Sequence, residues 1–254
     1  NVGGFLVPNL IALCLLYGQW RLGMWAAGGV AIAMSVVLLV TLRDTPRSLG
    51  LPPIEKYKHD ECERQSCSAA DQLSTWTLVK RYVLTNRALW ILAAGYVLIY
   101  VVRTAINDWG ALYLTEHGYS LAKADGCLSL FEVGGFFGSL AAGWLSDSLF
   151  SGSRGQTNVL FSLGTLLPLL VLWLTAASSY LFCIGAIFFI GFFIFGPQML
   201  IGVAAAELSH KKASGASTGF IGLFGYLGAA LSGYPVATVI HHYGWNDFFI
   251  VMMV

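Results

Sequence analysis

The chain has 254 residues, of which 57% are hydrophobic and only 11% are charged, with a formal net charge of +1. An ordinary soluble domain carries about 25% charged residues, and a single core cannot keep this much apolar surface from water. The composition therefore excludes a soluble globular protein and predicts an all-α membrane protein.

Seven apolar segments are long enough to cross a bilayer, and a shorter eighth follows. We expect them at about 2–18, 23–42, 88–114, 124–147, 157–176, 179–206 and 214–240, with the last beginning near 246. The chain starts without a methionine inside the first segment and stops at Val254 inside the last. We therefore expect part of a longer protein.

One segment, 44–87, breaks this pattern with prolines, serines and charged residues, a composition typical of a linker. We expect 1–43 to be the end of an N-terminal helix bundle with two spans, 44–87 to be a central loop, and 88–254 to be a C-terminal bundle. The segments Tyr17–Trp20 and Tyr243–Trp245 have weakly similar sequences, as two parallel structural repeats of a transporter would produce.

The basic residues give the orientation, because positive charge stays on the cytoplasmic side. Most of the 14 lysines and arginines fall in the 43–87 segment or on turns on the same side of the membrane, at Arg154, Lys211 and Lys212. Only Arg21 and Lys123 lie on the other side. We expect the 43–87 loop to be cytoplasmic, in a bacterial inner membrane.

Arg103 lies inside the apolar segment 88–114. An arginine at this depth is costly unless it faces a watery cavity or a partner, so it marks a functional site by default. The opposite helix face is apolar. Arg103 belongs to a polar stripe along one helix face, whose members are three or four positions apart: Tyr96, Tyr100, Arg103 and Asn107. This helix is predicted to line a water-filled cavity and to bind an anion.

A second motif lies on the turn between the segments 124–147 and 157–176, on the cytoplasmic side. Gly143 would let two helix backbones approach closely, and Asp147 would favour or cap the next helix N-terminus. Arg154, after Gly152, would bridge to a nearby carboxylate or helix C-terminus. The motif either stabilises one conformation of the protein and is released in another, or is a well-capped turn with no role in conformational change.

These motifs resemble a known family. The turn with Gly143, Asp147, Gly152 and Arg154 resembles the loop signature of the major facilitator superfamily. More narrowly, four segments look like the organophosphate:phosphate antiporter family, with its bacterial hexose-phosphate transporters and the related hexose-phosphate sensor: 44–55, 101–109, 195–202 and 211–216. The resemblance implies a major-facilitator-type bundle, from the fifth helix of that fold into the twelfth.

The resemblance also implies site residues. Arg103 matches an arginine that grips the substrate phosphate together with an arginine on the first helix, which this chain lacks. Acidic positions near the site match Asp108 and Glu132, and aromatic positions facing the cavity match Tyr100 and Tyr226. The chain departs from the pattern at Thr218 and Ile221, where hexose-phosphate antiporters are expected to carry an acidic–basic pair. This departure favours the sensor.

At about 1.5 Å per residue, Arg103 lies roughly 16 Å and Glu132 roughly 12 Å from the outer ends of their segments. These depths allow Arg103 and Glu132 to form an ion pair when the site is empty. A bound phosphate would displace Glu132 from Arg103, and this displacement would couple binding to a shift of helices. The alternative is that Arg103 forms only a structural ion pair, with Asp108 or Glu132.

Three functions follow: an antiporter that exchanges a sugar phosphate for inorganic phosphate, a sensor that reports external hexose phosphate to a membrane histidine kinase, and a membrane enzyme. An enzyme is disfavoured because no span combines a nucleophile, a base and an orienting group. We expect no metal, cofactor or nucleic acid. The glycine ladders at 134–138 and 219–228 predict close helix packing, and the five cysteines form no disulfide framework.

Overall fold

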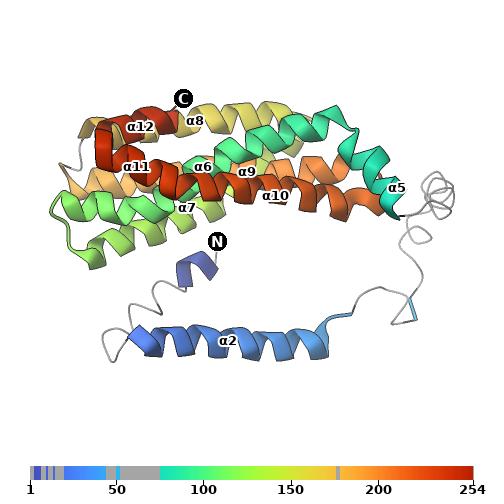
Figure 1. Ribbon diagram of the computed structural model, residues 1–254, viewed down its shortest axis with the longest axis horizontal. Helices are drawn as coiled ribbons and strands as arrows, with labels where there is room; N and C mark the ends of the chain where they lie inside the picture. The colour runs from blue at the N-terminus through green and yellow to red at the C-terminus, as the bar shows by residue number, and fades with distance from the viewer. Residues whose placement is uncertain are drawn as a thin grey trace.

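The computed structural model describes residues 3–6, 10, 14, 20–43, 50–51, 75–175 and 178–253. In these ranges the chain is helical with short turns, and no strand is present. Figure 1 shows α6 to α12 packed in one bundle, with α2 (Trp20–Thr41) running along one side of it. Within the described part of the chain, 6 helical segments are long and apolar enough to cross a membrane. The expected all-α membrane fold is confirmed.

Short helices lead into the bundle: α5 (Thr75–Val79) and the π-helical η2 (Lys80–Leu84). The bundle consists of α6 (Arg87–Glu116), α7 (Leu121–Ser148), α8 (Arg154–Thr175), α9 (Tyr180–Glu207), the 3-10 turn η3 (Lys211–Ala213), α10 (Ser214–Ser232), α11 (Tyr234–Tyr243) and α12 (Trp245–Met253). The spans expected from 23–42 to 179–206 match α2 and α6 to α9 within a few residues. Most of the expected span 2–18, and 44–49 and 52–74 of the expected loop, lie outside the described residues.

The expected span 214–240 lies within one candidate span, Lys211–Tyr243, but two helices share it. Gly233 leaves the helical conformation, with φ −76° and ψ −109°, and separates α10 from α11. Pro235 follows at the first turn of α11, where its missing N–H costs nothing. Trp109 donates its indole N–H to the carbonyl of Ser232 at 2.9 Å, so a side chain of α6 satisfies a carbonyl at the break.

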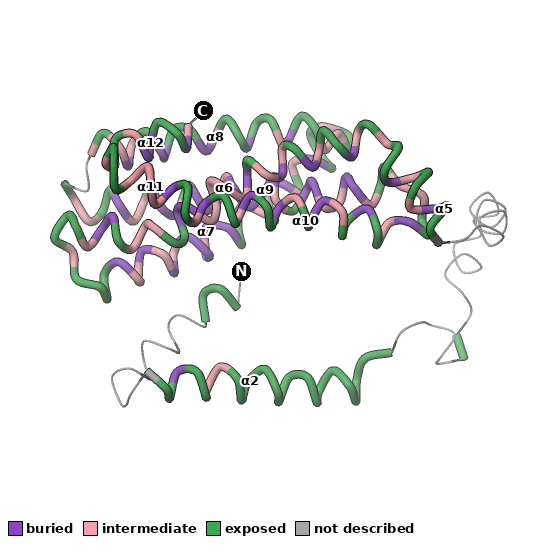
Figure 2. The backbone as a smooth tube through the Cα atoms, viewed as in Figure 1, coloured by how far each residue is buried: buried purple, intermediate pink, exposed green. Residues whose placement is uncertain are grey.

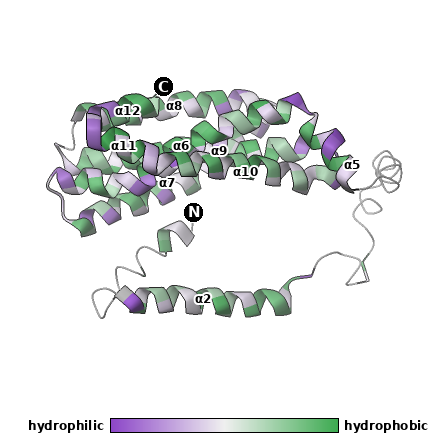
Figure 3. Ribbon diagram, in the orientation of Figure 1, coloured by the Kyte–Doolittle hydropathy of each residue, from purple (hydrophilic) through white to green (hydrophobic). Residues whose placement is uncertain are grey.

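Apolar side chains both fill the bundle and cover it. Figure 2 shows the buried residues between the bundle helices, whereas α2 is almost entirely exposed. Figure 3 shows hydrophobic residues along α2 and the middle of the bundle helices, with hydrophilic ones near the helix ends. Large apolar side chains such as Leu98 and Leu181 are exposed. An apolar exterior of this extent suits lipid and not water.

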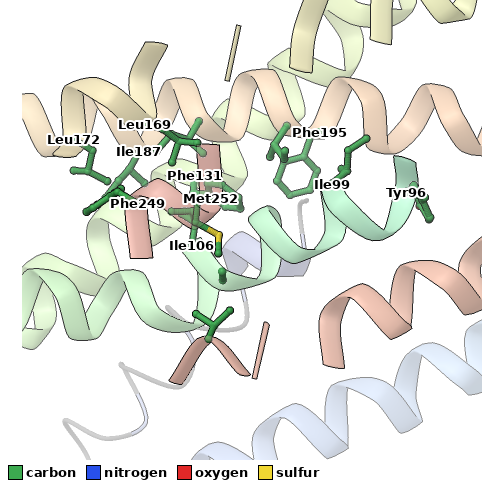
Figure 4. Close-up of a cluster of buried hydrophobic side chains, with 14 of the residues drawn as sticks. Tyr96, Ile99, Ile106, Phe131, Leu169, Leu172, Ile187, Phe195, Phe249 and Met252 are labelled. Atoms are coloured by element: carbon green, nitrogen blue, oxygen red, sulfur yellow. The ribbon is translucent and has the colours of Figure 1, made fainter. Parts of the chain in front are cut away.

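The core joins all the long bundle helices, and Figure 4 shows its central members. Phe131, Ile187 and Phe249 are almost fully buried and come from α7, α9 and α12. Tyr113, near the end of α6, is also buried and donates its hydroxyl to the carbonyl of Leu172. It therefore ties α6 to α8 within the core.

The closest helix pair is α7 with α9, and glycines make the approach possible. A side chain at Gly138 would overlap the carbonyl of Phe192, and one at Gly191 would overlap the carbonyl of Phe131. Gly134 likewise faces the backbone of α9. The two backbones are in direct contact, as small residues allow between membrane helices.

The second expected ladder, on α10, is confirmed for only half of its members. Gly225 packs against aromatic rings of α6, and a side chain at Gly228 would overlap the carbonyl of Val97. Gly219 and Gly222 face open space. The glycines therefore bring the α10 backbone close to α6 only in the half of α10 nearest its C-terminus.

Replacing Gly191 by alanine is expected to destabilise the protein, because the new Cβ meets the backbone of α7 and not a side chain that can move away. Overpacking of this kind costs about 1–3 kcal/mol. The measurement is thermal unfolding of the purified full-length protein in detergent. Gly202→Ala in the same helix is the control, since nothing lies within 4 Å of its Cβ position. Equal melting temperatures for the two variants would contradict the backbone contact.

Candidate functional site

Arg103 lies in the middle of α6, about 20 Å from the helix end at Glu116 by a rise of 1.5 Å per residue. Its guanidinium carbon is 4.8 Å from the ring centroid of Phe195 on α9 and 5.5 Å from that of Tyr100 on α6. Both distances allow attraction between the cation and the aromatic face. The side chain remains 28% exposed, so these rings hold the guanidinium without sealing it from the surroundings.

The charge partner of Arg103 is Glu132 on α7. The Nη2 atom of Arg103 and the Oε1 atom of Glu132 are 3.9 Å apart, close enough for strong attraction but beyond hydrogen-bond length. The Nε–H of Arg103 is buried and finds no acceptor among the described residues. The guanidinium therefore keeps donors that this carboxylate does not use.

Glu132 also lies beside the first predicted span. A side chain at Gly4, in the short helical stretch 3–6, would overlap the carboxylate of Glu132. The carboxylate is nearly buried, with 8% of its side chain exposed. The first predicted span thus reaches the charged pair formed by α6 and α7.

Tyr100 connects the charged pair to a polar group on α9. The Nε2 atom of Gln198 donates to the hydroxyl of Tyr100 at 3.4 Å, and the Oε1 atom of Gln198 is buried and makes no hydrogen bond within the described ranges. The ring of Tyr100 also contacts those of Tyr96 and Tyr226, at centroid distances of 4.7 and 6.3 Å.

The structure brings together three of the predicted site residues: Arg103, Tyr100 and Glu132. Tyr226 lies next to Tyr100 but is largely exposed. Asn107 donates to Asp108 at 3.2 Å, and both residues are exposed near the outer part of α6. Of the two carboxylates weighed as partners of Arg103, the structure places Glu132 at the guanidinium, and no ion pair joins Asp108 to Arg103 within the described residues.

The polar stripe on α6 is shorter than its spacing predicted. Tyr96 is buried and packs on Gly225 of α10, so it does not line a wet space. The close contact of α10 with α6 covers this end of the stripe. The accessible part of the stripe begins at Tyr100.

Two residues on α9, Phe195 and Gln198, were missed as site residues, although a family motif contains both. Gly135 on α7 leaves the space that the ring of Phe195 occupies, since a Cβ there would overlap the ring. The ring then lies over Arg103. The only signal in the sequence was the segment 195–202, and it gave no information about which helix this segment faces.

The second predicted cluster is a network of hydrogen bonds and ion pairs around Arg154, the first residue of α8. Its Nη1 donates to Ser146 at 2.9 Å and to Asp147 at 2.5 Å, near the end of α7. Its Nη2 and Nε reach the two carboxylate oxygens of Glu207, at 3.1 and 3.4 Å. This forked pairing joins the ends of three helices. The expected bridge to a carboxylate is present, with Glu207 on α9 as a partner that the sequence did not reveal.

Two glycines of this motif have different roles from each other. A Cβ at Gly143 would make only an ordinary contact, 3.5 Å from the side chain of Met199, so the expected close backbone approach at Gly143 is wrong. Gly152 has φ +85°, a conformation that other residues rarely adopt. It allows the turn that carries Arg154 back toward Asp147.

A comparison of the whole sequence with protein families decides the class. The profile of the Major Facilitator Superfamily matches residues 1–233. The chain belongs to the Major Facilitator Superfamily. It is a multi-pass bacterial inner-membrane protein, as expected from its spans.

Relatives within this superfamily confirm the narrower resemblance to organophosphate:phosphate antiporters. The chain is 49% identical to the membrane sensor protein UhpC of Salmonella typhimurium over 255 residues, and 49% identical to a probable hexose phosphate transport protein of Chlamydia pneumoniae over 265 residues. In both comparisons all of this chain is covered, and it spans 58% of the relative. The hexose-6-phosphate:phosphate antiporter of Escherichia coli is 33% identical over 89% of this chain and 44% of its own length.

The network around Arg154 generates a prediction about stability. Arg154→Gln and Glu207→Gln are expected to show a coupling energy of about 1 kcal/mol in a double-mutant cycle, because each removes the same forked pair. Thermal unfolding of the full-length protein at low and high salt measures it, and salt should reduce the coupling. Strictly additive effects at low salt would show that the pair contributes nothing to stability.

Proposed function

We propose that the protein is a secondary transporter that exchanges a sugar phosphate, of the glucose 6-phosphate class, for inorganic phosphate. The observation that carries this proposal is Arg103, a partly accessible guanidinium at mid-membrane depth with a buried Nε–H that makes no hydrogen bond in the described part of the chain. The names of the relatives point to the same chemistry.

Phosphate suits Arg103 for a chemical reason. A guanidinium presents planar paired donors that match two phosphate oxygens, and such charge-assisted bonds are strong away from bulk water. Glu132 meets only the Nη2 side, at a distance too long for a hydrogen bond. A phosphate with up to two negative charges accepts from both Nη groups or from Nη and Nε, so it competes effectively with Glu132.

Displacement of Glu132 links binding to movement. Arg103 lies on α6 and Glu132 on α7, so replacing their attraction by a ligand changes the forces between two helices and the segment that contains Gly4. We assign 1–43 to the N-terminal bundle, 44–87 to the cytoplasmic loop and 88–254 to the C-terminal bundle. The two bundles rock about the site, and the network around Arg154 holds one of the two conformations.

A second function, a sensor of external hexose phosphate that signals to a membrane histidine kinase, is favoured by α10. Thr218 and Ile221 replace the charged pair expected of hexose-phosphate antiporters. Thr218 bonds only to carbonyls of its own helix turn in the described structure, and Ile221 is buried in the core. A relative at 49% identity carries the name membrane sensor protein.

Exchange in proteoliposomes separates the two functions. Vesicles containing the full-length protein are loaded with inorganic phosphate and given labelled glucose 6-phosphate outside. A transporter accumulates label only when phosphate is present inside. Binding of glucose 6-phosphate with no exchange would support the sensor, and absence of binding would contradict both functions.

Arg103→Lys is expected to weaken binding of glucose 6-phosphate about 100-fold, because an ammonium keeps the charge but loses the forked donors. The measurement is equilibrium binding to the purified full-length protein. Arg87→Lys, at the exposed start of the same helix, is the matched control and should bind like the parent. If Arg103→Lys binds glucose 6-phosphate as tightly as the parent, Arg103 does not clamp the phosphate.

A further inference from the structure

We propose that Gln198 forms a hydroxyl-binding subsite beside Arg103, so that the site selects a phosphorylated polyol over inorganic phosphate. This inference rests on the proposed function and extends it, because it assigns the part of the ligand that is not phosphate.

Gln198 lies on α9 one helical turn after Phe195, whose ring covers the guanidinium of Arg103. Tyr100 connects the two polar residues: its hydroxyl receives the amide N–H of Gln198 at 3.4 Å, and its ring lies 5.5 Å from the guanidinium carbon of Arg103. The amide and the guanidinium therefore both lie next to Tyr100.

Each of these two neighbours of Tyr100 has a buried polar atom without a hydrogen-bond partner among the described residues. The Oε1 of Gln198 and the Nε of Arg103 are buried, and neither makes a hydrogen bond within the described ranges. Buried polar atoms are almost always paired in native proteins, since leaving one unpaired costs the loss of its hydration. An unpaired acceptor and an unpaired cationic donor, on two residues that both contact Tyr100, favour a ligand with a hydroxyl and an anionic group.

A sugar hydroxyl suits the amide in either orientation, because a hydroxyl both donates and accepts. If the amide oxygen faces the ligand, the hydroxyl donates to it; if the amide N–H₂ does, the hydroxyl accepts. Inorganic phosphate on Arg103 has no carbon frame that extends to Gln198. The amide therefore adds affinity for the sugar ester and not for the phosphate with which it is exchanged.

The backbone that carries Gln198 is held on two sides. Gly196 lies so close to Phe161 on α8 and Ala142 on α7 that a Cβ there would overlap both side chains. Pro197 follows within the helix and fixes its own φ. The amide is thus presented from a rigid segment, and ligand binding loses little entropy at this residue.

The test compares Gln198→Leu with the parent for two probes, glucose 6-phosphate and inorganic phosphate, by equilibrium binding to the full-length protein. In Gln198→Leu, the affinity for glucose 6-phosphate divided by the affinity for inorganic phosphate is expected to fall about tenfold. Gln156→Leu, which removes the same amide from an exposed position on α8, should keep the parent ratio. Gln198→Met, unbranched and of similar length, repeats the test if leucine disturbs folding.

Deoxy analogues of glucose 6-phosphate identify the contact. One analogue should bind the parent about tenfold more weakly than glucose 6-phosphate does, and that difference should vanish in Gln198→Leu. An unchanged affinity ratio, or an equal loss for both probes, would overturn the subsite while leaving the phosphate clamp intact. A parent protein that binds neither probe would overturn the proposed function, and the subsite with it.

Discussion

A charge in the middle of a membrane helix requires a partner, and the attraction between Arg103 and Glu132 meets this requirement. The pair comes from two helices, and its closest atoms are 3.9 Å apart, without the hydrogen bonds that would lock it. A buried pair of this kind contributes little net stability, because desolvation offsets much of the attraction. It instead leaves the guanidinium available to a stronger acceptor, such as a phosphate oxygen.

Direct contact of helix backbones gives this pair its geometry. Gly134, Gly138 and Gly191 bring α7 against α9, and Gly135 leaves the space for the ring that covers Arg103. Gly228 holds α10 against α6 beside Tyr100. The site thus stands on helices that cannot slide without backbone clashes.

Patterns within one helix predicted much of the fold and part of the site. Span positions follow from hydrophobic length, the charged partner of Arg103 follows from the cost of buried charge, and the bridge from Arg154 follows from its place beside helix ends. Contacts between helices did not follow from these patterns. Glu207 closes the network from the end of a distant helix, Tyr96 is covered by α10, and Gly233 divides one expected span into two helices.

The most direct test is an experimental structure of the full-length protein with glucose 6-phosphate bound. We predict phosphate oxygens within hydrogen-bond distance of the guanidinium of Arg103, with the carboxylate of Glu132 moved away from it. A phosphate bound elsewhere, with Arg103 and Glu132 still facing each other, would contradict the account.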